Sequence, residues 1–319
     1  MNLPKIHSIT KKICVALLGG FLLVFLLFHA TANLFILRHD DGAWYSAFCH
    51  FMGTNWLVKI MEICLLGFIL LHIALTLWLA FTNRLARPVR YHQASRSKTH
   101  STSKLMVWSG ILIFVCLILH FTDFYFVKMG WVKGEYMVKT EKLQSEEVMG
   151  LVQFSQQMNM SPEELINELE AESAMYVDEN GDNEEVAEYI SNMRDQMAVI
   201  NILQRASTED NFSEDKQWIR HLTYDERQTL KKVLPESDPE PDFYYMARQK
   251  FSSLYLVVMY LLFFVVVFFH LRHAFPSAFQ TLGLNNYKYN GIIEVLGQIY
   301  TWIVCLMFAA VPILVYLGL

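Results

Sequence analysis

Four histidines lie inside long apolar stretches of this chain, one in each of four stretches. They are His29, His72, His120 and His270. An imidazole inside a membrane-length apolar stretch costs free energy unless it faces protein, so each of these residues indicates a functional site. The chemistry open to them is proton transfer or metal ligation, because a neutral imidazole offers one nitrogen lone pair to a metal ion.

The apolar stretches themselves indicate a polytopic membrane protein. The 319 residues are 54% hydrophobic, and the mean hydropathy is +0.26. About 20 apolar residues in a helix cross a hydrocarbon core of about 30 Å. We therefore expect five spanning helices, near residues 13–37, 56–82, 105–128, 251–272 and 291–318. The first stretch is too long for a signal-peptide core and has no small-residue cleavage site, so we expect it to be retained.

Basic residues between the spans predict the orientation of the chain. Residues 1–12 carry three lysines and no acidic residue, and residues 84–104 carry six basic residues and no acidic one. The positive-inside rule places both segments in the cytoplasm. We therefore expect a protein of the cytoplasmic (inner) membrane, with its N-terminus in the cytoplasm and its C-terminus outside.

A large acidic segment separates the third expected span from the fourth. It holds 26 of the 31 acidic residues, between Glu135 and Asp242, against 13 basic residues from Lys128 to Lys250. So much charge predicts a soluble segment outside the membrane and not a further span. We expect three parts: spans one to three in 1–129, a mainly helical insertion in 130–250, and spans four and five in 251–319. The predicted fold class is all-α, a five-helix membrane bundle with this insertion.

Local patterns predict the elements of the insertion. Ser161, followed by Pro162 and Glu164, indicates the start of a helix, and Ser213 indicates a second one over about 213–234. The sequence DENGDNEE, residues 178–185, is typical of a turn, and PESDPEPD, residues 235–242, is typical of a linker that returns the chain to the membrane.

The predicted topology sorts the four histidines into two depths. Spans one and three run outward and carry His29 and His120 late in their sequences, while spans two and four run inward and carry His72 and His270 past their middles. At a rise of about 1.5 Å per residue, His29 pairs with His120 near the outer face. His72 pairs with His270 nearer the cytoplasm. Two pairs of imidazoles are the ligands that two haems b require. Covalent c-type haem, zinc fingers and iron–sulphur clusters are not expected, because no CxxC or CxxCH motif occurs.

Other readings of these histidines stay open at this point. Each could be a packing residue bonded to a neighbouring helix, or a proton relay in a transporter. His273, one turn after His270, is the rival ligand in the fourth span. Because it lies nearer the interface, we assign it instead to contact with a haem propionate or a quinone.

Four charged residues are further candidates for the site. Arg38 and Arg272 lie just beyond histidine-bearing segments, where a guanidinium would neutralise a haem propionate. Glu62 and Asp123 lie near the predicted outer pair, and we expect them to take up or release protons.

On these residues the chain resembles the dihaem cytochrome b anchor subunit of succinate:quinone oxidoreductases and fumarate reductases, in its five-helix b558 type. HSITKKICVALLGGFLLVFLLFHATANL is similar to the family's first helix, and HLRHAFPSAFQTLGLN is similar to its fourth. The resemblance covers about residues 1–130 and 250–319. Ala274 and Pro276 depart from the family's pattern, and the long insertion lies outside the resemblance.

The resemblance implies axial ligation of two haems b by His29, His72, His120 and His270. It also implies a flavoprotein subunit and an iron–sulphur subunit docked on the cytoplasmic face, and menaquinone as the quinone. The chain would transfer electrons within that complex without a dicarboxylate-oxidising site of its own, in contact with lipid and with no nucleic acid. Two alternatives are a dihaem subunit of a formate or hydrogen dehydrogenase, and a haem-free proton-coupled transporter.

Overall fold

The structure, a computed structural model, describes residues 8–86, 101–143, 184–208 and 218–319, with single positions between 153 and 171. Ser161, Pro162, Ser213 and most of the turn expected at 178–185 lie outside the described residues. Contacts divide the chain into two compact units. The membrane unit is Met1–Phe121 with Ala247–Leu319, and the lobe is Thr122–Met246.

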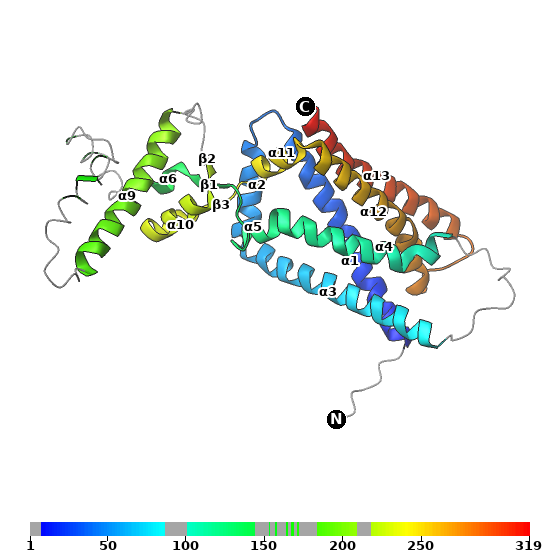
Figure 1. Cartoon of the computed structure of the whole chain (residues 1–319). Helices are drawn as coiled ribbons and strands as arrows, with labels where there is room; N and C mark the ends of the chain where they lie inside the picture. Colours follow the sequence, from blue (N-terminus) through cyan, green and yellow to red (C-terminus); the bar gives the residue numbers. More distant parts are fainter. Residues whose placement is uncertain are drawn as a thin grey trace, which may run out of the picture. The chain divides into compact units, whose positions relative to one another are not determined.

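Five helices of the membrane unit are long and apolar enough to cross a membrane, as the sequence predicts. They are α1 (Ser8–Leu34), α3 (Trp56–Leu85), α4 (Ser101–His120), α12 (Leu254–Thr281) and α13 (Asn290–Tyr316). A lipid-facing chain must satisfy its backbone hydrogen bonds within the segment, which is why these apolar stretches form helices. Figure 1 shows the five helices running alongside one another. Helix α12, the fourth span, ends at Thr281, about two and a half turns beyond the expected end at residue 272.

A cluster of buried hydrophobic residues joins α1, α12 and α13. Its buried residues are Ala30, Val267, Leu271, Val304 and Cys305. Helices α12 and α13 approach closely at Gly297, where a Cβ atom would lie 2.8 Å from a ring carbon of Phe275. The Tyr300 hydroxyl of α13 donates to the Leu23 carbonyl of α1 at 2.5 Å. By contrast, no residue of α3 is fully buried.

A short helix, α2 (Ala43–Thr54), joins α1 to α3 after a 3-10 turn over Phe35–Leu37. Gly42 precedes it with a φ of 76°, a left-handed conformation that suits glycine. Asn55 then caps α3, because its side chain accepts hydrogen bonds from the Leu57 and Val58 amides.

The chain is mostly helical, as predicted, but the lobe also contains a small antiparallel sheet that the prediction of a mainly helical insertion did not include. Strands β1 (Tyr136–Lys139), β2 (Trp218–Leu222) and β3 (Glu240–Pro241) pair in the order β2-β1-β3. Among its described residues, the lobe has the helices α5 (Phe126–Lys128), α6 (Thr140–Leu143), α9 (Glu184–Thr208) and α10 (Tyr224–Val233). Aromatic and β-branched residues in β1 and β2 favour strands, which is the signal that the helical prediction missed.

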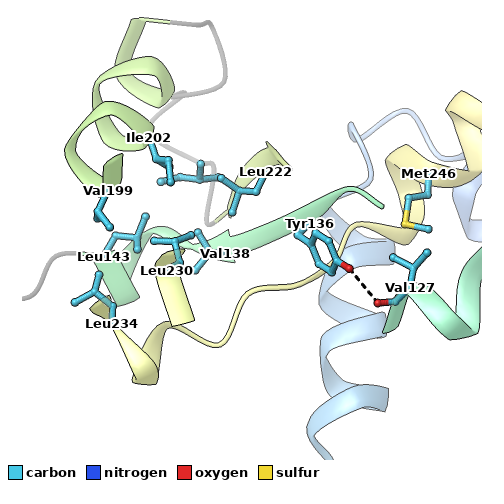
Figure 2. Close-up of a cluster of buried hydrophobic side chains, with 11 residues drawn as sticks. Val127, Tyr136, Val138, Leu143, Val199, Ile202, Leu222, Leu230, Leu234 and Met246 are labelled. Atoms are coloured by element: carbon cyan, nitrogen blue, oxygen red, sulfur yellow. Dashed lines mark hydrogen bonds between the residues drawn. The ribbon is translucent and has the colours of Figure 1, made fainter. Parts of the chain in front are cut away.

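The lobe has a hydrophobic core of its own (Figure 2). Side chains of β1, β2, α6, α9 and α10 meet there, and the fully buried ones include Tyr136, Val138, Leu143, Leu222 and Leu230. The Tyr136 hydroxyl donates to the Val127 carbonyl at 3.1 Å, so the one polar atom of this ring has a partner.

Two expectations for the lobe need correction. The helix predicted over 213–234 begins only at Tyr224, because Thr223 and Glu226 form a reciprocal capping box there and Trp218–Leu222 is a strand. Residues 235–242 are not a free linker. They form a 3-10 turn over Pro235–Ser237 and strand β3, and they end on the fully buried Asp242.

The Asp242 carboxylate accepts three hydrogen bonds from two donor groups. Arg220 donates from Nη1 to Oδ1 at 2.9 Å and to Oδ2 at 2.8 Å. The Tyr245 amide, in the first turn of α11 (Phe243–Phe251), also donates to Oδ1 at 3.0 Å. A buried carboxylate is tolerated when charged and neutral donors surround it in this way.

We predict that Asp242→Ala destabilises the lobe by about 3 to 5 kcal/mol, because it removes the buried partner of an ion pair that accepts hydrogen bonds from Arg220 and the Tyr245 amide. Hydrogen exchange of the β1 and β2 amides in the full chain, in detergent, measures the free energy of opening. Asp225→Ala is the matched control. Asp225 pairs with Lys133 at 3.6 Å in solvent, and its loss should cost about 0 to 1 kcal/mol. Equal losses in the two variants would contradict a structural role for the buried pair.

Candidate functional site: two pairs of histidines in the membrane unit

The outer pair joins α1 to the end of α4. The ring centres of His29 and His120 lie 6.0 Å apart, and the ring planes cross at 77°. Two imidazoles that bind one metal ion from opposite sides, with nitrogen–metal bonds of about 2 Å, have ring centres about 6 Å apart. The separation of these rings therefore fits a shared metal ion.

Aromatic rings surround this pair. Phe25 stacks on His29 at 5.3 Å between ring centres, and Phe308 of α13 lies 5.8 Å from the same imidazole. Tyr260 of α12 lies 6.4 Å from His120. Directly after His120 the helix widens into a π-helical turn, Phe121–Tyr125, a distortion that often occurs at functional sites. Aromatic side chains thus line much of the surface around these two imidazoles.

The inner pair joins α3 to α12. His72 and His270 lie close enough to interact electrostatically. Each ring also lies against a glycine of a neighbouring helix. A Cβ atom at Gly19 of α1 would be 3.5 Å from Cε1 of His72, and one at Gly110 of α4 would be 3.6 Å from Cε1 of His270. Any side chain longer than a methyl group at either glycine would therefore compete with the imidazole for space.

These contacts place the two pairs at two levels of the bundle. Gly19, beside His72, is ten residues before His29 on α1, and Gly110, beside His270, is ten residues before His120 on α4. Ten residues of helix rise about 15 Å, so both helices give the same separation between the levels. These pairs, His29 with His120 and His72 with His270, are the same two that the predicted topology gives.

The polar partners of the four imidazoles differ. Ser109 Oγ lies 3.0 Å from Nδ1 of His270. Nδ1 of His72 is buried and makes no hydrogen bond, although the Val15 carbonyl is close enough to interact with the ring. An unpaired buried nitrogen of this kind costs free energy unless a ligand or solvent satisfies it.

A chain of polar side chains reaches His29. Nδ2 of Asn33 lies 3.4 Å from Nε2 of His29, and the Tyr45 hydroxyl donates to Oδ1 of Asn33 at 3.0 Å. Burial, with a smaller contribution from Cys49, raises the pKa of Tyr45 well above its usual value. The phenol therefore stays protonated and remains a donor, which fixes the orientation of the Asn33 amide.

The structure places the other predicted site residues as follows. Arg38 pairs with Asp40 at 3.0 Å and lies over the Trp44 ring, and Arg272 is exposed. His273 is half-buried and interacts electrostatically with His270. Glu62, on α3, and Asp123, in the π-helical turn, are also half-buried. Their roles towards a propionate, a quinone or a proton stay predictions.

Sequence reasoning did not find Ser109, or the roles of Asn33 and Tyr45. Asn33 had a usable signal, because it follows His29 by four residues and so shares its helix face. Ser109 had none, since its partner is 161 positions away in the chain.

The donor set fits two bis-histidine haems: two imidazole pairs, aromatic rings around the outer pair, and glycines that leave room for the inner rings. Comparison of the chain with protein-family models, with curated proteins and with solved structures finds no match. The geometry of the histidines therefore carries the functional argument.

We predict that His120→Ala removes one haem per chain and spares the other. His120 belongs to the pair with His29, and the His72–His270 pair keeps both of its imidazoles. A redox difference spectrum, with haem content per chain, measures this. Selective loss of the component assigned to the His72–His270 pair would show that the pairing is wrong.

His270 and His273 provide a second, matched test. His270→Ala should remove the inner haem, whereas His273→Ala should keep two haems per chain, because only His270 carries the contacts to Ser109 and Gly110. Haem content of the purified variants decides between them. The reverse result would make His273 the ligand.

Proposed function

We propose that this chain is a dihaem cytochrome b, the membrane-anchor subunit of a succinate:quinone oxidoreductase. In this proposal His29 and His120 hold one haem b, and His72 and His270 hold the other. The chain passes electrons between a cytoplasmic flavoprotein and iron–sulphur pair and menaquinone in the membrane. The observation that carries the proposal is the 6.0 Å separation of the His29 and His120 ring centres.

The chain's own residues have three tasks in this function. Four helices bring the imidazoles together in two pairs, the aromatic rings of Phe25 and Phe308 keep water from the outer pair, and Ser109 orients one inner ligand. Bound haem would supply one-electron redox chemistry. Axial ligand identity, hydrogen bonding to the ligands and burial are the protein's means of tuning it.

The spacing of the levels supports a role in electron transfer across the membrane unit. Levels about 15 Å apart along α1 and α4 cover about half of a hydrocarbon core of about 30 Å. One pair is thereby brought towards each side of the bilayer. A subunit that links a soluble partner on one side with quinone elsewhere in the membrane needs this placement.

We predict two haems b per chain in the protein purified from its native membrane, and reduction of both by succinate when the soluble partners remain bound. Pyridine haemochrome analysis gives the haem content, and visible spectra follow the reduction. Haem that is reduced by formate or hydrogen but not by succinate would assign the chain to another quinone-linked dehydrogenase. A chain that carries no haem would favour the transporter alternative.

A further inference from the structure

The hydroxyl of Ser109 makes two contacts. Its oxygen lies 3.0 Å from the Met106 carbonyl, one turn earlier on α4, and 3.0 Å from Nδ1 of His270 on α12. Both contacts have normal hydrogen-bond lengths. This serine thus connects a histidine-bearing position of α12 to the backbone of α4.

A serine hydroxyl has one hydrogen to donate and two lone pairs to accept with. The Met106 carbonyl can only accept, so the single hydrogen of Ser109 belongs to that bond. With that hydrogen on the Met106 carbonyl, the contact with His270 runs the other way, from Nδ1–H to Oγ. This direction assigns the tautomer of His270: the proton is on Nδ1, and the lone pair is on Nε2.

We infer that Ser109 is a positioning residue that holds His270 as the Nδ1–H tautomer, so that Nε2 is free to bind the inner haem. The tautomer follows from the bond of Ser109 to the Met106 carbonyl, with no assumption about haem. The consequence for haem rests on the proposed function.

Gly110 of α4 also contacts this ring. A Cβ atom there would lie 3.6 Å from Cε1 of His270, so the glycine lets the Nδ1–Cε1 edge of the imidazole rest on α4. The same edge of His72 rests on Gly19, but no hydroxyl stands beside it and its Nδ1 makes no hydrogen bond. The two inner ligands are therefore supported differently, and only His270 is fixed by a side chain.

A hydrogen bond from the non-ligating nitrogen raises the basicity of a histidine ligand and orients its ring. Loss of such a partner typically weakens metal binding about 10-fold to 100-fold. Ser109→Ala should therefore weaken haem retention at the inner site by about this factor. It should also raise the midpoint potential of that haem, because a less basic ligand stabilises the ferric state less.

The test uses the purified complex in detergent. Redox titration and haem retention are measured for the wild type, Ser109→Ala and Ser109→Thr, with the outer haem as the internal standard. The alanine variant should change the inner haem alone, and the threonine variant, which keeps a hydroxyl, should restore it. Thr82→Ala is the matched control, because it removes a helix-bonded hydroxyl of α3 that bonds only to the Trp78 and Leu79 carbonyls.

A second measurement keeps the inference separate from the proposed function. Nitrogen-15 NMR of histidine-labelled chain reports directly which nitrogen of His270 carries the proton. If the wild-type chain contains no haem, the proposed function fails, while an Nδ1–H signal that is lost in Ser109→Ala still supports the inference. An Nε2–H tautomer in the haem-free wild type overturns it. So does an inner haem with the same potential and retention in Ser109→Ala as in the wild type.

Discussion

An imidazole within a hydrocarbon layer needs a partner, and this need determines which faces of α1, α3, α4 and α12 turn inward. The free-energy cost of facing lipid is large enough that each histidine must meet protein, another polar group or a ligand. Placing one histidine on each helix therefore fixes the rotation of all four helices about their axes. The glycines follow from the same constraint, because an imidazole that lies against a neighbouring helix leaves no room for a long side chain there. Gly19 and Gly110 are where this happens.

The constraint explains why sequence reasoning predicted so much of the membrane unit. A span of about 20 apolar residues forms a helix in lipid, because its backbone must make its hydrogen bonds within the span. A polar side chain in such a helix is favoured on the face that contacts protein. Together with the alternation of basic segments, this was enough to predict five spans and to pair His29 with His120 and His72 with His270. The role of Ser109 was not predicted, because a serine in an apolar helix can bond to the backbone of its own helix and its position does not indicate a distant partner.

The lobe lacks such a constraint, and prediction did worse there. In water a short segment such as Trp218–Leu222 can form either a helix or a strand, and its pairing with β1 decides the outcome. The charge pattern of residues 235–242 indicated a solvated linker, yet Asp242 is buried. Its partner Arg220 lies 22 positions earlier in the chain, so no local pattern could reveal the pair. Tertiary contacts, and not local propensity, determine both features.

The membrane unit and the lobe each make their own stabilising contacts, and this explains how the membrane unit tolerates a long insertion. The inner pair takes His72 from before the insertion and His270 from after it, so α12 must return to the bundle in one register. The lobe, for its part, closes on itself. Its hydrophobic core draws on both ends of the segment, from Val127 to Met246, and Asp242 ties β2 to the start of α11. Because the lobe buries its own apolar side chains and pairs its own buried charge, contacts within the bundle set the register of α12. The contacts of His270 with Ser109 and Gly110, and the packing of Phe275 on Gly297, provide that register.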